Sequence, residues 1–203
     1  MMNRWTLGLI VLSGISAISF GGCGTRVSRV DVSEVTDLSG RWNDTDSRLV
    51  SEEMVQDALN RAWIDQFQKK QGKEPTVIVG NVVNRSHEHI NMQTFIKDLE
   101  RGLINSGRVS FVAAKGEREE IRGERLDQAK HSTGETAKGA GKEIGADYMM
   151  LGSIDTILDE ADGVKAMFYQ VNLEMIDMAD NRKVWVGQKK IKKIISKDRI
   201  KLF

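Results

Sequence analysis

The stretch from residue 146 to residue 195 constrains the fold more than any other part of the chain. Three long strands are predicted there, at residues 146–157, 164–177 and 183–195, with short turns at 159–163 and 179–182. In the second strand, apolar side chains from Tyr169 to Met175 alternate with polar ones. One dry face and one wet face are typical of an antiparallel sheet that is covered on one side. We therefore expect a three-stranded antiparallel meander.

Upstream of the meander, the sequence predicts helices that alternate with short strands. In chain order they are a helix from Asp46 or Ser47 to Gln71, a strand at 76–83, a helix capped by Asn91, a strand at 109–113, a charged helix at 115–128 and a short helix at 135–144. The strand at 76–83 is an apolar, β-branched run, so we expect it to be central and buried on both faces. The helix at 115–128 is intensely charged, which indicates a solvated helix with ion pairs inside it. The whole predicts an α/β fold: a mixed sheet of about five strands with helices mainly on one face.

The first 22 residues have the layout of a signal peptide. Arg4 supplies a positive charge, residues 5–20 are uncharged and largely apolar, and Gly21 and Gly22 precede Cys23. The apolar run is shorter than the roughly 20 residues that a membrane-spanning helix needs. It predicts a cleaved leader rather than an anchor.

Cys23 is the only cysteine of the chain, so no disulfide can form within it. Gly21-Gly22-Cys23 resembles the lipobox of bacterial lipoproteins, although Phe20 stands where leucine is usual. The alternative is a plain secretory peptide that leaves a free thiol, which secreted proteins seldom keep. We expect lipidation of Cys23, a stable membrane anchor, and outer-membrane sorting because Gly24 follows.

Three segments follow from this interpretation. Residues 1–22 are the signal peptide, 23–38 are the lipidated cysteine and a short tether, and 39–203 are the globular domain. The tether contains no proline and spans at most ~55 Å when fully extended.

Charge and motifs exclude several classes of function. The chain has 30 basic and 29 acidic residues, and a nucleic-acid-binding domain usually has a strongly basic face. The sequence shows no Ser-His-Asp arrangement, phosphate loop or dinucleotide fingerprint. Its carboxylates cluster on the charged helix, where no cleft would shift their pKa values. We expect a binding protein without a cofactor, not an enzyme.

The sequence His87-Glu88-His89 is the strongest candidate for a metal site. It lacks a defined third ligand, and a real zinc site needs a full ligand set. We therefore expect a polar loop ahead of the Asn91 cap and no metal. Arg85, His87 and His89 in this loop remain candidates for binding a partner.

Trp42 is a further candidate for binding a partner, because a tryptophan just before a helix either staples the domain entrance or belongs to a docking surface.

The C-terminal lysines could bind an anionic polymer of the envelope. We favour the alternative that they protect an edge strand. The basic residues of this C-terminal segment are Lys189, Lys190, Lys192, Lys193, Lys197, Arg199 and Lys201.

Four segments are similar to the LpoB family of outer-membrane lipoproteins, which are penicillin-binding protein activators. They are residues 38–47 (LSGRWNDTDS), 78–81 through 88–91, 144–148 with 151–153, and 183–190. The resemblance covers about residues 38–195. It implies a globular domain that passes through the peptidoglycan layer and stimulates a bifunctional synthase, a class A penicillin-binding protein, in the inner membrane. The enteric members carry a long proline-rich tether, which this chain lacks.

The piece around residues 144–153 is also similar to curli-transport and Tol-type periplasmic domains. This leaves a second hypothesis, an accessory lipoprotein of envelope assembly or secretion. An envelope enzyme is the third and weakest hypothesis.

Overall fold

A computed structural model describes residues 25–136, 138 and 143–196. The predicted signal peptide, Cys23 and the lysines beyond residue 196 lie outside these ranges. The chain divides into two units, Met1–Val32 and Ser33–Phe203. The second unit holds every helix and strand given below. The division at residues 22/23 and 38/39 stays a prediction.

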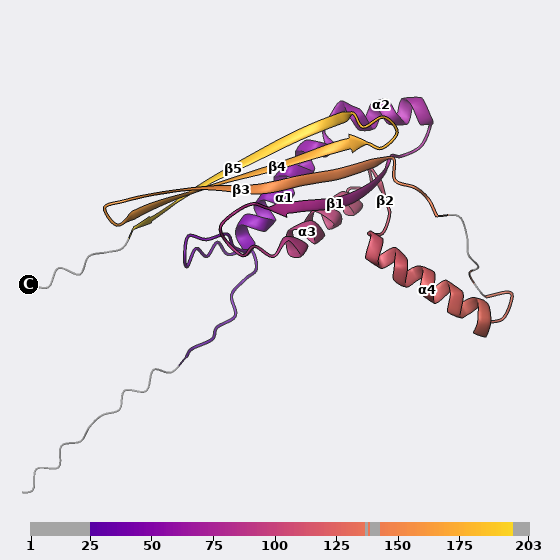
Figure 1. The fold of residues 1–203 in the computed structure, drawn as a ribbon, viewed down its shortest axis with the longest axis horizontal. Coiled ribbons are helices and arrows are strands. Elements are labelled where there is room, and N and C mark those ends of the chain that lie inside the picture. The colour runs from indigo at the N-terminus through magenta and orange to yellow at the C-terminus, as the bar shows by residue number, and fades with distance from the viewer. Residues whose placement is uncertain (1–24, 137, 139–142, 197–203) are drawn as a thin grey trace, which may run out of the picture. The chain divides into compact units, whose positions relative to one another are not determined.

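Four helices and five strands make up the described part of the second unit (Figure 1). They are α1 (Asp44–Leu59), α2 (Ala62–Gln71), β1 (Thr76–Asn84), α3 (Met92–Asn105), β2 (Ser110–Phe111), α4 (Lys115–His131), β3 (Tyr148–Ala161), β4 (Val164–Asp177) and β5 (Lys183–Ser196). The strand order is β2-β1-β3-β4-β5. β1 runs parallel to β2 and β3, whereas β3, β4 and β5 are antiparallel. The predicted mixed sheet and its C-terminal meander are confirmed.

The turn between β3 and β4 is tighter than the sequence prediction. β3 continues to Ala161 and pairs with Val164, so only Asp162 and Gly163 form the turn. Their φ angles are 51° and 80°, and Asp-Gly accepts two successive positive φ angles more readily than most pairs. The predicted turn at 159–163 is therefore too long.

The prediction of one long helix up to Gln71 is wrong, because the chain breaks between α1 and α2. Arg61 is extended, with φ −97° and ψ 158°. The last carbonyl groups of α1 find side-chain donors instead of helical ones. The indole nitrogen of Trp63 donates to the carbonyl of Ala58 at 2.8 Å, and the guanidinium of Arg108 donates to that of Leu59. Both donors satisfy carbonyls that a helix end leaves free.

The start of α1 also differs from the prediction, because Asn43 rather than Asp46 or Ser47 is its N-cap. The side chain of Asn43 accepts a hydrogen bond from the Asp46 backbone N–H, and the Asp46 carboxylate accepts one from the Asn43 N–H, both at 3.0 Å. This reciprocal pair is a capping box. Asn91 caps α3 and Gly72 ends α2 as predicted.

The charged helix is confirmed as α4, in which no residue is buried. Its ion pairs differ from the prediction, since most of those observed join a residue of α4 to a residue outside the helix. Glu117 pairs with Lys97 of α3 at 2.6 Å and Arg122 with Glu143 at 2.7 Å. Of the predicted helix at 135–144, residues 137 and 139–142 lie outside the described ranges and the others are not helical.

The core lies between the sheet and helices α1 and α3, which cover one face (Figure 1). Phe95, Leu99 and Leu103 of α3 are completely buried, as their spacing predicts. Each such side chain contributes about 1.5–3 kcal/mol of burial free energy. β1 is buried on both faces only in its first half, because Asn81 and Val83 face the open side of the sheet and are exposed.

Candidate functional site

The loop between β1 and α3 has a backbone held by its own side chains. The Asn84 side-chain nitrogen donates to the carbonyl of Glu88 at 2.8 Å, and the Ser86 hydroxyl donates to the Asn84 side-chain oxygen at 2.6 Å. The Arg85 N–H donates to the carbonyl of Ile154 in β3 at 2.8 Å. These bonds tie the loop to the sheet and fix its course.

Side chains of this loop alternate between the protein and the solvent. Asn84, Ser86 and Glu88 are half-buried. Arg85, His87 and His89 are exposed. The structure thus brings the three predicted partner-binding residues of this loop onto one ordered segment, with their side chains outward. Of these three side chains, only that of His87 has a hydrogen-bond partner within the described residues, the hydroxyl of Thr156 at 3.0 Å.

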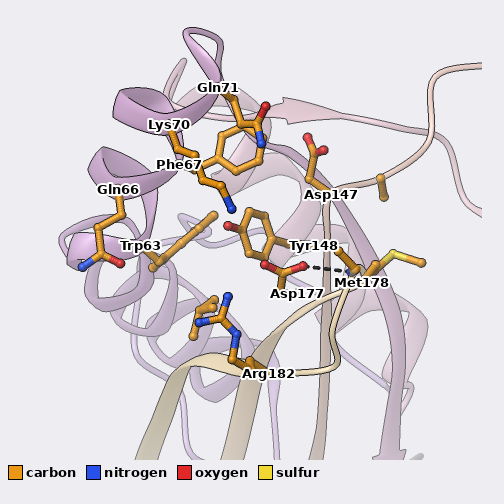
Figure 2. A pocket seen from close by; sticks show the side chains of 13 residues that line it. Trp63, Gln66, Phe67, Lys70, Gln71, Asp147, Tyr148, Asp177, Met178 and Arg182 are labelled. Carbon is orange, nitrogen blue, oxygen red and sulfur yellow. Dashed lines mark hydrogen bonds between the residues drawn. The ribbon is translucent and has the colours of Figure 1, made fainter.

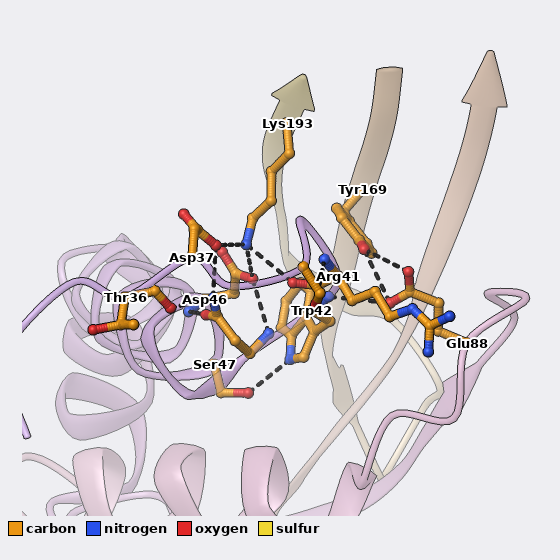
Figure 3. Close-up of polar contacts among 11 residues, drawn as sticks. Thr36, Asp37, Arg41, Trp42, Asp46, Ser47, Glu88, Tyr169 and Lys193 are labelled. Atoms are coloured by element: carbon orange, nitrogen blue, oxygen red, sulfur yellow. Dashed lines mark hydrogen bonds and ion pairs between the residues drawn. The ribbon is translucent and has the colours of Figure 1, made fainter. Parts of the chain in front are cut away.

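Glu88 anchors the loop to two other segments, a role that the sequence did not reveal (Figure 3). Its carboxylate accepts from the backbone N–H of Trp42 and from the hydroxyl of Tyr169, both at 3.0 Å. Tyr169 is completely buried on β4. Burial, and then the hydrogen bond to the Glu88 carboxylate, raise the pKa of Tyr169.

Trp42 lies at the entrance of the domain and is half-buried. Its ring packs edge-on against Phe95 and Tyr169, with centroids 6.2 and 5.5 Å apart. Its indole nitrogen donates to the hydroxyl of Ser47 at 2.7 Å. These contacts favour the stapling role of Trp42, and its part in binding a partner stays a prediction.

Residues 36–43, which we call the strap, run past β5 and are held there by Lys193 (Figure 3). The Lys193 ammonium contacts the carboxylates of Asp37 and Asp46 at 2.6 Å each. The hydrogen bond from Lys193 lowers the pKa of Asp37. Burial acts to lower the pKa of Lys193, but the hydrogen bonds to both carboxylates outweigh it and raise this pKa.

Beside Arg85, the open face of the sheet carries a shallow groove of about 400 Å³. Val83 and Val186 line it and are 40% and 64% exposed. Next to them, a network of polar side chains joins three strands. Its members are Ser153, Asp155, Gln170, Asn172 and Gln188. The groove offers apolar area within a polar frame, which is the composition of many protein-binding surfaces.

The basic residues of β5 are partly structural. β5 is an edge strand of the sheet, and its Lys189 pairs with Glu53 of α1. Lys190 and Lys192 are exposed. This arrangement fits lysines that protect a sheet edge.

Within the described ranges, no group of three or more His, Asp, Glu or Cys side chains could hold a metal ion. In the same ranges, no helix has the length and apolar character needed to cross a membrane.

Fold and site together define a small α/β domain that presents an ordered polar loop and a neighbouring groove. The family model described as peptidoglycan-synthase activator LpoB matches residues 46–191. The chain therefore belongs to the LpoB family. No curated relative matches the sequence.

Several solved structures are similar to this chain at low sequence identity. The LpoB C-terminal domain from Escherichia coli is 13% identical, with a TM-score of 0.40 over 73% of this chain and 99% of that chain. The corresponding domain from Salmonella enterica is also 13% identical, with a TM-score of 0.35 over 64% and 93%. Lipoprotein GNA1162 from Neisseria meningitidis is 11% identical, with a TM-score of 0.38 over 63% and 89%.

Proposed function

We propose that this chain is a lipoprotein, anchored in the outer membrane through Cys23, that binds and stimulates a bifunctional peptidoglycan synthase, a class A penicillin-binding protein. Membership of an activator family supports the regulatory role. The lipobox-like sequence before Cys23 supports the anchor. The chain itself supplies no catalytic group in this proposal, and the chemistry belongs to the synthase.

The docking surface in this proposal is the loop that carries Arg85, His87 and His89, together with the adjoining groove. The observation that carries it is the alternation in the loop. Asn84 and Ser86 hold the backbone of the loop in place through their side chains. The outward side chains of the loop are exposed, and within the described residues only that of His87 contacts the rest of the domain, through the Thr156 hydroxyl. A surface ordered before binding loses little entropy when the partner arrives. Arginine is also enriched among the residues that dominate binding energies at interfaces.

The test uses the full chain, purified in detergent, with the class A synthase of the same organism. Glycan-chain polymerisation and peptide cross-linking are measured with and without the lipoprotein. We expect Arg85→Glu to raise the concentration for half-maximal stimulation by at least about tenfold, since charge reversal at an interface costs over 1.4 kcal/mol. Lys69→Glu is the matched control, because Lys69 is an exposed base on α2 away from the loop.

The possible results separate the function from the site. No stimulation by the wild-type chain contradicts the activator function. Stimulation that Arg85→Glu leaves unchanged, with an unchanged melting temperature, keeps the activator function and contradicts the docking surface. Recovery of only assembly proteins from solubilised envelopes would favour the secretion-accessory alternative.

A further inference from the structure

A second pocket lies at the start of β3 (Figure 2), whereas the docking loop contacts β3 farther along, at Ile154 and Thr156. It has a volume of about 530 Å³ and is formed by α2, the start of β3 and the turn between β4 and β5. This volume falls within the range of small-molecule sites. None of the residues proposed above to bind a synthase lines it.

The floor of the pocket is an aromatic cluster. Tyr148 packs edge-on against Trp63 and Phe67, with ring centroids 4.9 and 5.5 Å apart. Trp63 and Tyr148 are only 3% and 6% exposed. These rings are fixed by the core, so a ligand would meet a surface that needs no rearrangement.

The hydroxyl of Tyr148 has no hydrogen-bond partner among the described residues. Tyr169, the other tyrosine, uses its hydroxyl on the Glu88 carboxylate. The ring is buried, but the hydroxyl is not among the enclosed polar atoms, so this donor is open to the pocket. At neutral pH this phenol is a protonated donor, as in any tyrosine, and burial followed by the nearby charges of Asp177 and Asp147 raises its pKa further.

Charges of both signs stand around this hydroxyl. Asp147 and Asp177 each use one carboxylate oxygen on a backbone N–H, that of Thr76 at 2.8 Å and that of Ala179 at 2.9 Å. The Lys73 ammonium also contacts the bonded oxygen of Asp147, at 3.5 Å, so a ligand ammonium would share this carboxylate with Lys73. The other oxygen of each carboxylate accepts no hydrogen bond within the described part of the chain. Lys70 enters from α2 and Arg182 from the β4–β5 turn, as Figure 2 shows. Arg182 is engaged through Nε by Asp180 at 2.6 Å.

We propose that this pocket binds a small zwitterion, an amino acid or a short peptide. The ligand carboxylate accepts hydrogen bonds from the Tyr148 hydroxyl and the Lys70 ammonium, and the ligand ammonium lies between the carboxylates of Asp147 and Asp177. Its apolar side chain packs on Phe67 and Met178, the latter 48% exposed. This inference does not rest on the proposed function.

The test uses the full chain in detergent and three probes: alanyl-alanine, its N-acetyl derivative and its C-terminal amide. Binding is followed by saturation-transfer NMR of the probe. We expect a dissociation constant of about 1 mM for the free dipeptide, in keeping with its few heavy atoms. Both blocked forms should bind at least about tenfold more weakly. The N-acetyl form lacks the ammonium that would face Asp147 and Asp177, and the amide lacks the carboxylate that would face Lys70.

Two variants place the binding in this pocket. Tyr148→Phe removes only the unpartnered hydroxyl and should weaken binding about tenfold while the melting temperature stays that of the wild type. Lys70→Gln should weaken binding, whereas Lys69→Gln, one residue away on the same helix, should not. Equal binding of the three probes, no binding of any, or equal effects of the two lysine variants would each overturn the proposal.

Discussion

Glu88 does more for the fold than either histidine beside it. It receives the Trp42 N–H and the Tyr169 hydroxyl and so joins the domain entrance, the docking loop and β4. His87 and His89 are exposed in the same loop. Substitution of Glu88 would therefore disturb the structure, while substitution of His89 addresses the surface and substitution of His87 removes one exposed hydrogen bond to Thr156.

Tyr169→Phe removes the hydroxyl that Glu88 binds and leaves the ring in place. Hydrogen bonds to a charged group contribute about 1.5–3 kcal/mol, so we expect the free energy of unfolding to fall by that amount. Urea unfolding monitored by circular dichroism measures the change. Tyr148→Phe is the matched control and should alter stability by less than about 0.5 kcal/mol, because its hydroxyl has no partner to lose. Equal losses in both variants would contradict this account of Glu88.

Lys193→Met removes the cation that holds the strap. The side chains of Lys193 and Asp46 are only 10% and 8% exposed, and removal of one partner of such a pair costs about 3 kcal/mol. Urea titrations at several pH values measure the difference between wild type and variant.

The pH dependence of that difference follows from Asp37. The folded-state pKa of Asp37 lies below that of an ordinary aspartate, so its contribution is fully present above the ordinary pKa and is lost as the pH falls through the folded-state pKa. The pKa of Lys193 is raised, so the contribution of Lys193 is present below the ordinary lysine pKa and is lost as pH rises through the folded-state value. We expect the difference to be constant near neutral pH and to shrink below about pH 4. A difference that does not change down to pH 2 would contradict the ion-pair account.

Among the elements, α4 stands apart because none of its residues is buried. Its side chains reach the rest of the described structure through ion pairs such as Lys97–Glu117. Exposed ion pairs contribute only about 0–1 kcal/mol each. This helix therefore has little tertiary stabilisation and should open more readily than α1 or α3.

Hydrogen exchange tests this expectation for α4. Its amides should exchange well before those of α3, since opening α4 uncovers no core. Gly123→Ala should raise the free energy of local opening in α4 by up to about 1 kcal/mol, because alanine favours the helix and a Cβ there meets nothing within 4 Å. Amide exchange should therefore slow in α4 alone. The global melting temperature should not move. Exchange of α4 at the rate of the core would show that it unfolds only with the whole domain.

The elements also show which predictions the sequence can support. The alternation from Tyr169 to Met175 depends only on which face of a strand is dry, so β4 was predictable with its bounds. The break after Leu59 was not, because it depends on Arg108 donating to a carbonyl 49 residues away. Periodicity continues across the break and conceals it.

The same contrast applies to the two sites. Arg85, His87 and His89 share one polar loop, and the sequence singles them out as candidates. The second pocket is assembled from Phe67 of α2, Tyr148 of β3 and Arg182 of the turn between β4 and β5. No local pattern joins these residues, so only the fold reveals that they meet.

For the whole molecule, the proposed anchor at Cys23 would make the length of chain between it and the domain set the reach. The strap begins at Thr36 and is held by Lys193 through Asp37, so about 13 residues separate it from Cys23 and span at most ~45 Å. A flexible chain of this length covers far less on average.

Changes within residues 25–32 or directly after Val32 alter the length of the tether and leave every helix and strand in place. In cells, deletion of residues 25–32 should abolish stimulation of the synthase, and insertion of about 15 glycine and serine residues after Val32 should preserve or increase it. Incorporation of labelled peptidoglycan precursor measures both effects. The purified variants should stimulate the synthase in detergent as the wild type does. Full activity of the deletion variant in cells would show that reach is not limiting.

The strap also decides where mechanical load would enter the domain. If the lipid anchor and a bound partner pull in opposite directions, tension along the N-terminal segment first meets the contacts of Lys193 with Asp37 and with the Arg41 carbonyl, before it reaches the first turn of α1. Release of residues 37–41 would add about 17 Å of slack at ~3.5 Å per residue, while Trp42 stays packed on Phe95 and Tyr169. The domain could then yield length under tension and recover it when the load falls, with the sheet and the docking loop left intact.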